Sequence, residues 1–174
     1  MQEILKKIYL FKELSEEELD SLVVISSFNS YKKDSLLFMR GEIGEHLFIL
    51  IEGDLSVFKH NNKGNEIVIG FFSPYSLIAE AALLRNLPFP SGTRFKTDGR
   101  ILKVQINSFR RYFLTNPKVS TEIINSLLSK IQLLQQNIHL NIASTAKEKT
   151  LHFYDTNSLI VSKLKKYEIA TLRF

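Results

Sequence analysis

The expected fold of this 174-residue chain rests on the stretch Gly41-Glu42-Ile43-Gly44-Glu45-His46-Leu47-Phe48-Ile49-Leu50-Ile51-Glu52-Gly53-Asp54. A charged turn with two glycines leads into an apolar run at 47–51, and a Glu-Gly-Asp turn follows it. Glycine adopts positive φ at no steric cost, so both flanks are typical of tight turns. The apolar run predicts a strand buried on both faces, and residues 55–58 predict a second strand. Together they predict a hairpin of a β-sandwich or β-barrel.

The composition limits the classes of protein that remain. Apolar residues make up 44% of the chain, which is enough for a packed core. The chain has no cysteine, which excludes disulfides, thiolate-ligated iron–sulfur clusters and cysteine-type zinc sites within it. No apolar stretch approaches the roughly 20 residues of a membrane span, and the N-terminus lacks the order of a signal peptide. We therefore predict a cytoplasmic protein that does not contact a membrane.

Short strand signals fill the region from about 28 to 106, after a helix capped by Ser15 and Glu18. The β-rich runs are separated by turn clusters, a spacing that predicts a sandwich, barrel or jelly roll. They lie at 35–39, 47–51, 55–58, 67–72, 93–97 and 101–106. Two of the turns, at 61–65 and at Asp98-Gly99, carry hairpin signals, and residues 77–84 predict one short inserted helix.

A long helix is predicted from Pro117 to about residue 142, because proline is tolerated at the first helical position. Apolar residues recur in it at alternating spacings of three and four, which is the seam of a two-stranded coiled coil. The predicted seam consists of Ile124, Leu127, Ile131, Leu134 and Ile138. Ile123 and Leu128 widen the stripe, so one flank is expected to pack on the β region. A second copy of the chain is the predicted partner, with an ordinary core-facing helix as the alternative.

Residues 144–174 carry six Lys or Arg against three Asp or Glu, a basic balance that suits contact with nucleic acid. Residues 165–172 predict the first helix of a helix-turn-helix, in which the small Ala170 allows close packing. A recognition helix for the major groove would have to follow it. The sequence ends at Phe174 inside this motif, so we expect a truncated form of a longer protein.

The order of these features resembles the CRP/FNR family of bacterial transcription regulators. The matching pieces are Leu10-Phe11-Lys12-Glu13-Leu14-Ser15 with Glu18-Leu19, residues 41–53, Asn116-Pro117, and Thr145-Ala146-Lys147-Glu148-Lys149. The resemblance implies an α+β fold with an N-terminal jelly roll, flanking helices, a dimerisation helix and part of a winged helix-turn-helix. It places a cyclic-nucleotide-binding-like sensor domain at 1–115, the dimerisation helix at 116–143 and the start of the DNA-binding module at 144–174. Lys163, Lys165 and Lys166 are the implied contacts to DNA phosphates.

The phosphate-binding cassette, at Ala79 to Thr93 in this chain, departs from the family pattern. In cyclic-nucleotide binders a Glu accepts a hydrogen bond from the ribose hydroxyl, and a later Arg pairs with the cyclic phosphate. Glu80 stands at the Glu position of this chain, but Phe89 stands where the Arg should be. A buried phosphate without a cationic partner is very costly, so a cyclic nucleotide is not the expected ligand. Alternatives left open are a small apolar, planar or gaseous-effector cofactor, a pocket filled by the protein itself, and a Glu80 that only braces its own loop.

The residues expected around the effector lie either in the cassette or where the dimerisation helix usually faces the effector pocket in this family. They are Ala79, Glu80, Ala81, Phe89, Ser91, Leu134 and Gln135. Haem stays open as a cofactor, because a histidine could serve as axial ligand. The candidates for that role are His46, His60, His139 and His152.

No enzymatic chemistry is predicted. A jelly-roll metallo-oxygenase needs several clustered ligands, and His46 stands alone between Glu45 and Leu47. Neither a phosphate-binding glycine loop nor a nucleophile–base pair can be singled out. The leading hypothesis is a homodimeric regulator that senses a small effector and binds DNA in its full-length form. The alternative is a stand-alone sensor or interaction module without specific DNA binding.

Overall fold

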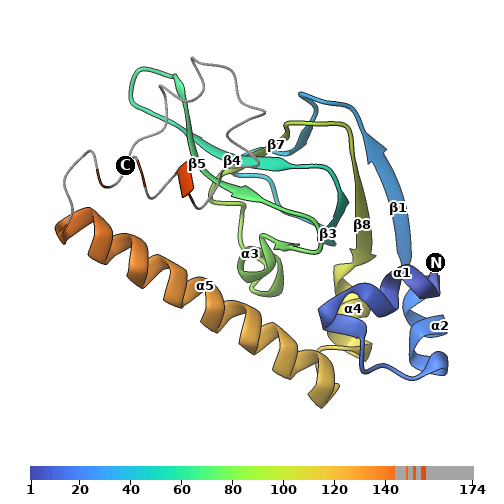
Figure 1. The fold of residues 1–174 in the computed structure, drawn as a ribbon. Coiled ribbons are helices and arrows are strands. Elements are labelled where there is room, and N and C mark those ends of the chain that lie inside the picture. The colour runs from blue at the N-terminus through green and yellow to red at the C-terminus, as the bar shows by residue number, and fades with distance from the viewer. Residues whose placement is uncertain (144–147, 149–150, 152–153, 156–174) are drawn as a thin grey trace.

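Two four-stranded antiparallel sheets face each other at the centre of the computed structural model, which describes residues 1–143, 148, 151 and 154–155. Helices gather at one end, and a long helix runs past the sheets (Figure 1). In chain order the elements are α1 (Gln2–Lys7), η1 (Tyr9–Phe11), α2 (Glu16–Val24), β1 (Ser26–Tyr31), β2 (Leu36–Phe38), β3 (His46–Glu52), β4 (Leu55–His60), β5 (Glu66–Phe72), β6 (Leu77–Ile78), α3 (Glu80–Leu84), β7 (Gly92–Phe95), β8 (Gly99–Gln105), α4 (Ile106–Tyr112) and α5 (Pro117–Ala143). The strand orders are β1-β8-β3-β6 and β2-β7-β4-β5. The predicted α+β jelly-roll architecture is confirmed for the described residues.

Strand β3 has the double-sided burial that its sequence predicts. All five residues at 47–51 are buried, and β3 lies between β8 and β6 in the first sheet. Ile49 pairs with Leu102 on one side and with Leu77 on the other. An apolar strand on both faces is stable only where both faces are covered, and a central position supplies that cover.

The turn after β3 is not a hairpin, so that prediction was wrong. Strand β4 pairs with β5 and β7 in the second sheet, so the Glu52-Gly53-Asp54 turn carries the chain from one sheet to the other. Gly53 has φ +90°, and a Cβ there would lie 2.7 Å from the carbonyl oxygen of Asp98. The turn residues fix a change of direction, but they do not select the partner strand.

The Asp98-Gly99 hairpin was also predicted wrongly, for the same reason. Strand β7 belongs to the second sheet and β8 to the first, so this turn is a second crossing between the sheets. The Asp98 carboxylate accepts hydrogen bonds of 2.8 Å from the Lys32 ammonium and from the Lys33 backbone N–H. The hairpin predicted at 61–65 is confirmed, because it joins β4 to β5 and is closed by a 2.9 Å bond from Asn61 N–H to the Asn65 carbonyl.

Residues 77–84 form a short strand followed by a short helix, in place of the single helix predicted. Leu77 and Ile78 pair with β3 as β6, and α3 begins only at Glu80. Between them Ala79 has φ +54°, a left-handed conformation that turns the chain from strand into helix. This turn sets the direction in which the Glu80 side chain leaves the backbone.

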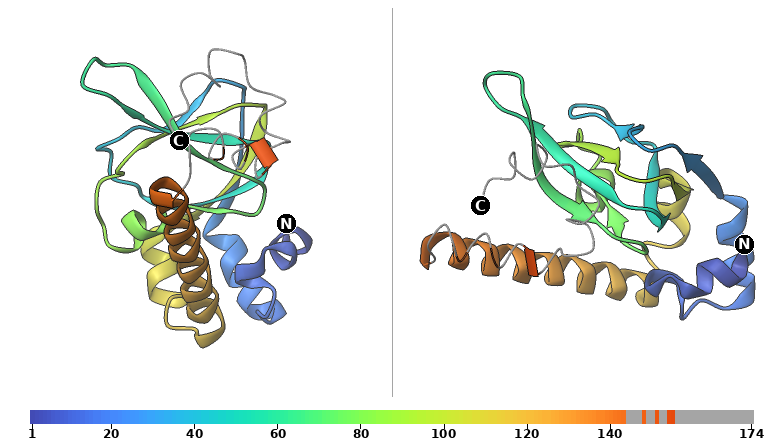
Figure 2. Two further views of the ribbon diagram at one scale, coloured as in Figure 1. Left: turned by 60° about the vertical axis from the view of Figure 1, so that its left-hand side comes forward. Right: turned by 45° about the horizontal axis from the view of Figure 1, so that its top comes forward.

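Helix α5 begins at Pro117, as predicted, and its first turn is capped by Asn116, whose side-chain oxygen accepts a 3.0 Å bond from Lys118 N–H. Val119 and Ile123 are buried against the helical end of the domain. The helix then runs alongside the sheets and extends past them (Figure 2). Its N-terminal half is therefore part of the domain core, while its C-terminal half leaves the domain.

The capping box of α2 gives a prediction for the pH dependence of stability. Glu18 Oε2 accepts a 2.8 Å bond from Ser15 N–H, and this bond holds the pKa of the Glu18 carboxyl below its usual value. A carboxyl whose pKa is lower in the folded state stabilises the fold above its unfolded pKa, and that contribution is lost as the pH falls. As the pH is lowered from about 7 to about 3.5, the free energy of unfolding measured in urea titrations should fall less for Glu18→Gln than for the wild type. Glu17→Gln, an exposed neighbour in the same turn, should follow the wild type; an identical pH response in the Glu18 variant would contradict the assignment.

Candidate functional site

Phe89 occupies the position of the cassette where the family pattern calls for a phosphate-pairing arginine. Its side chain is 3% exposed and lies inside the domain. The ring stacks on Phe38 at a centroid distance of 3.8 Å and an interplanar angle of 22°, and it lies 6.3 Å from the ring of Phe48. Phe38 and Phe48 are themselves stacked at 5.7 Å. The three rings, called the Phe38–Phe48–Phe89 cluster below, join β2, β3 and the cassette into one apolar unit.

The loop that leads into β3 closes over this cluster. Gly41 N–H donates to the Phe89 carbonyl and Phe89 N–H donates to the Glu42 carbonyl, both at 2.9 Å. A Cβ on Gly44 would lie 2.4 Å from Cζ of Phe89 and 2.5 Å from Cδ2 of Leu83. Glycine at position 44 therefore serves the close packing of the loop on the Phe89 ring. The space beneath the loop is filled by protein.

Glu80 is the buried carboxylate of the cassette, with 3% of its surface exposed. The Lys130 ammonium of α5 donates a hydrogen bond to it and forms an ion pair with it. Lys130 also donates to the Leu77 carbonyl at 2.9 Å and lies 5.6 Å from the centre of the Phe72 ring. A buried carboxylate requires such a partner, so the ion pair fixes α5 against the cassette.

The partner of Glu80 was not found from the sequence, which suggested that Glu80 braces its own loop. The signal that could have identified this partner is the spacing of residues along α5, which shows the face of the helix on which each residue lies. Lys130 follows Ile123 and Leu127 at steps of four and three, and this places it on the side of α5 that faces the domain. A lysine in the middle of a core-facing ridge calls for a buried anion opposite.

The other predicted effector residues do not form one site. Ser91 is buried at the start of the segment leading into β7, whereas Ala81 is exposed on α3. Ala79 is half-buried and supplies the left-handed turn described above. Leu134 and Gln135 are exposed on α5 beyond the part that contacts the domain, and neither lines the cavity beside Glu80.

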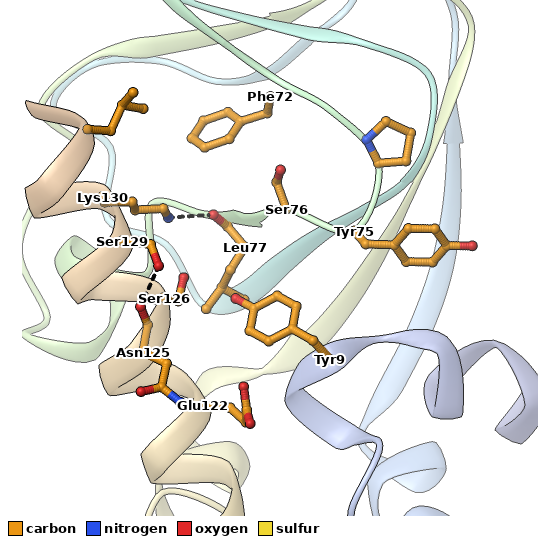
Figure 3. A pocket seen from close by; sticks show the side chains of 12 residues that line it. Tyr9, Phe72, Tyr75, Ser76, Leu77, Glu122, Asn125, Ser126, Ser129 and Lys130 are labelled. Carbon is orange, nitrogen blue, oxygen red and sulfur yellow. Dashed lines mark hydrogen bonds between the residues drawn. The ribbon is translucent and has the colours of Figure 1, made fainter. Parts of the chain in front are cut away.

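That cavity lies between α5, η1 and the segment that joins β5 to β6 (Figure 3). Its volume is about 450 Å³. Tyr9 reaches the cavity from η1 on the side of Ser126, and burial raises the pKa of the Tyr9 phenol. Lys130 and Phe72 form another part of the wall. The sequence carries no motif for this cavity, because its lining comes from segments more than a hundred residues apart.

The predicted seam of α5 divides between two environments. Ile124, Ile131, Leu134 and Ile138 are exposed, with Ile131 at 49% of its surface, and Leu128 joins this exposed stripe. Leu127 instead packs against the domain core. An exposed stripe of this length is typical of a surface that another protein covers.

Several predicted residues fall outside the described part of the chain or away from the site. The predicted residues Lys163, Lys165, Lys166 and His152, and the side chain of His139, lie outside the part of the chain that the structure describes. His46 and His60 lie on β3 and β4 and do not line the cavity. Within the described residues there is no group of three or more His, Cys, Asp or Glu able to hold a metal ion. None of the described helices is both long enough and apolar enough to span a membrane.

These features define a jelly-roll domain of two sheets, called the β-roll below, with an inserted cassette helix whose carboxylate faces a long C-terminal helix. The family model for the cyclic nucleotide-binding domain matches residues 28–116, and the chain belongs to this family. CRP-type regulators are among its relatives, as the sequence resemblance indicated.

Relatives of several kinds carry the same domain. The chain is 20% identical over 138 residues to a CRP-like cAMP-activated global transcriptional regulator of Mycobacterium tuberculosis, covering 79% of the chain and 62% of that protein. It is 22% identical over 165 residues to a cAMP-dependent protein kinase type II regulatory subunit of Drosophila melanogaster, covering 92% of the chain and 41% of the relative. The chain thus spans about two fifths to three fifths of the length of these relatives.

Solved structures share the fold at low sequence identity. The catabolite activator protein of Thermus thermophilus superposes with a TM-score of 0.64 at 20% identity, over 75% of this chain and 62% of that one. DNR from Pseudomonas aeruginosa also gives 0.64, at 18% identity, over 79% of this chain and 61% of that one. At these identities the likeness concerns the fold alone.

The contact between Gly44 and Phe89 gives a prediction for stability. Gly44→Ala should lower the free energy of unfolding by about 1–3 kcal/mol, because its Cβ overlaps two buried side chains. Gly70→Ala is the matched control, since nothing lies within 4 Å of a Cβ there, and it should change stability by less than about 0.5 kcal/mol. Chemical denaturation measures both. In a Phe89→Ala background the cost of Gly44→Ala should shrink; equal costs for the two glycine variants would show that the packing is not as described.

Proposed function

We propose that this chain is the sensor and dimerisation part of a cytoplasmic CRP/FNR-type transcription regulator. It acts as a homodimer and responds to a small effector other than a cyclic nucleotide. The observation that carries this proposal is the double role of α5. One side of the helix is tied to the cassette through Lys130 and Glu80, and another side presents the exposed apolar stripe. A change at the cassette therefore reaches the surface on which a second copy would pack.

The proposed division of labour follows the arrangement of the elements. Residues 1–115 sense the effector, 116–143 pair the two copies, and 144–174 begin the DNA-binding module, where Lys163, Lys165 and Lys166 contact phosphates. The effector shifts the population of α5 positions relative to the β-roll, and the DNA-binding modules change their relative orientation with it. Because α5 is one continuous helix of 27 residues, a rotation at Lys130 is carried to its C-terminal end.

Two observations argue against a cyclic nucleotide as the effector, although relatives are named as cAMP-activated or cAMP-dependent. The residue at the phosphate-pairing position is a phenylalanine packed in an aromatic cluster, and it offers no charged donor. The carboxylate that would accept from the ribose already pairs with Lys130. A cyclic nucleotide would have to break this ion pair and bury an unpaired phosphate.

A stand-alone sensor or interaction module is the second candidate. It is supported by the kinds of relative that share the domain, since a cAMP-dependent protein kinase regulatory subunit and the potassium channel KOR2 of Oryza sativa are among them. In this alternative the dimer forms but does not bind DNA specifically. A binding selection from random duplex DNA with the full-length protein separates the two, because only the regulator enriches a two-fold symmetric site.

The proposal predicts the outcome of nucleotide titrations. In isothermal titration calorimetry the wild-type chain should show no saturable heat of binding with cAMP or cGMP, because it lacks the arginine side chain that would pair with the cyclic phosphate. The Mycobacterium tuberculosis relative named above, described as cAMP-activated, serves as the positive control under the same conditions. Saturable binding of either nucleotide at the same site would overturn the assignment of Phe89.

The exposed stripe predicts the oligomeric state. Ile131→Glu should convert a dimer to a monomer in size-exclusion chromatography with light scattering, because it places a charge in the centre of the apolar seam. Gln132→Glu, an exposed neighbour outside the stripe, should leave the dimer intact. A monomeric wild type, or a dimer that survives Ile131→Glu, would remove α5 as the interface.

A further inference from the structure

We propose that the cavity between α5 and the β-roll binds a neutral aromatic molecule that carries hydroxyl groups. It rests on the proposed function, since it names a place and a chemical class for the effector. The site differs from the cassette pocket, which the Phe38–Phe48–Phe89 cluster fills. Its volume of about 450 Å³ falls within the range of small-molecule sites.

The charges around the cavity are already compensated. Lys130 pairs with Glu80, and Glu122, on the same side of α5, lies 3.7 Å from the Lys12 ammonium. An anionic ligand would compete with Glu80 for Lys130, and a cationic ligand would compete with Lys12 for Glu122. A neutral ligand displaces neither ion pair, and this favours a neutral ligand over a charged one.

The polar groups that remain are suited to hydroxyl recognition. Ser126 and Ser129 line the cavity from α5, and Ser126 lies on the side of Tyr9, whose phenol is neutral near pH 7 (Figure 3). The Ser129 hydroxyl donates to the Asn125 carbonyl at 2.9 Å, so its lone pairs are left to accept from a ligand. The Asn125 amide adds both a donor and an acceptor to the same wall.

The opposite wall is suited to an aromatic ring. Phe72 lies across the cavity from Tyr9 (Figure 3). Pro74 and Leu133 add apolar side chains to the lining of the cavity. Leu133 is 52% exposed, so a planar ligand lying against it removes apolar surface from water. A ligand here touches both α5 and the β5–β6 segment, so its binding favours the α5 position that closes the cavity around it.

Resorcinol, a neutral aromatic diol, is the probe for this site. In saturation-transfer NMR it should bind the wild-type chain saturably, and toluene and benzoate should bind at least about fivefold more weakly, because they lack the hydroxyls or add a charge. Ser129→Leu fills the cavity from an exposed helix position and should weaken resorcinol about tenfold or more. Gln132→Leu is the matched polar-to-leucine control outside the lining and should bind within about twofold of the wild type.

Thermal unfolding of both variants establishes that they fold. Leu133→Ser is a second variant at an exposed position; it removes an apolar side chain from the lining and should also weaken resorcinol binding. No saturable resorcinol binding, equal binding of toluene or benzoate, or full binding by Ser129→Leu would each overturn the proposal. Every lining residue comes from one chain, so the measurement can also be made on the Ile131→Glu variant. If the wild type does not bind resorcinol but is a dimer and does not bind cAMP, the cavity site is rejected. The proposed function then still stands, because its own two tests have given the expected results.

Discussion

The ion pair between Glu80 and Lys130 is the constraint on which the rest of the site depends. Glu80 is held in the interior by the left-handed turn at Ala79, and a carboxylate buried to this degree is stable only with a cationic partner. Lys130 supplies that charge from a helix that begins outside the β-roll. The pair thereby sets the rotation of α5 about its axis. That rotation decides which residues face the cavity and which form the exposed stripe.

Local signals in the sequence predicted local structure well. The capping box at Ser15, the buried strand β3, the loop at 61–65 and the start of α5 at Pro117 were all found, because each depends on residues within a few positions of one another. The two turns at Gly53 and Asp98-Gly99 were located correctly, but their strands were paired wrongly. Turn chemistry reports a reversal of direction, whereas the choice between two facing sheets depends on contacts across the whole domain.

In the site, too, features that depend on nearby residues were predicted from the sequence, and features that depend on distant contacts were not. The sequence identified Phe89 as the departure from the family pattern, but the stacking of Phe38 and the close approach of Gly44 depend on tertiary packing. Lys130 was readable only as a charged residue at a core-facing helical position, and its partner lies 50 residues away. The cavity had no sequence signal, since Tyr9 and Ser126 come together only when the two ends of the domain meet.

The order of strands in the first sheet has a consequence for the synthesis of this protein. Strands β1 and β3 do not pair with each other, and each pairs with β8 on one side. Residue Ser26 meets Val104, so the first sheet stays open until the chain has been made to the end of β8. Such distant pairings slow folding and leave apolar strand edges uncovered in the meantime. The apolar run of β3, which makes the finished sheet stable, is for that interval the segment of the nascent chain most exposed to aggregation.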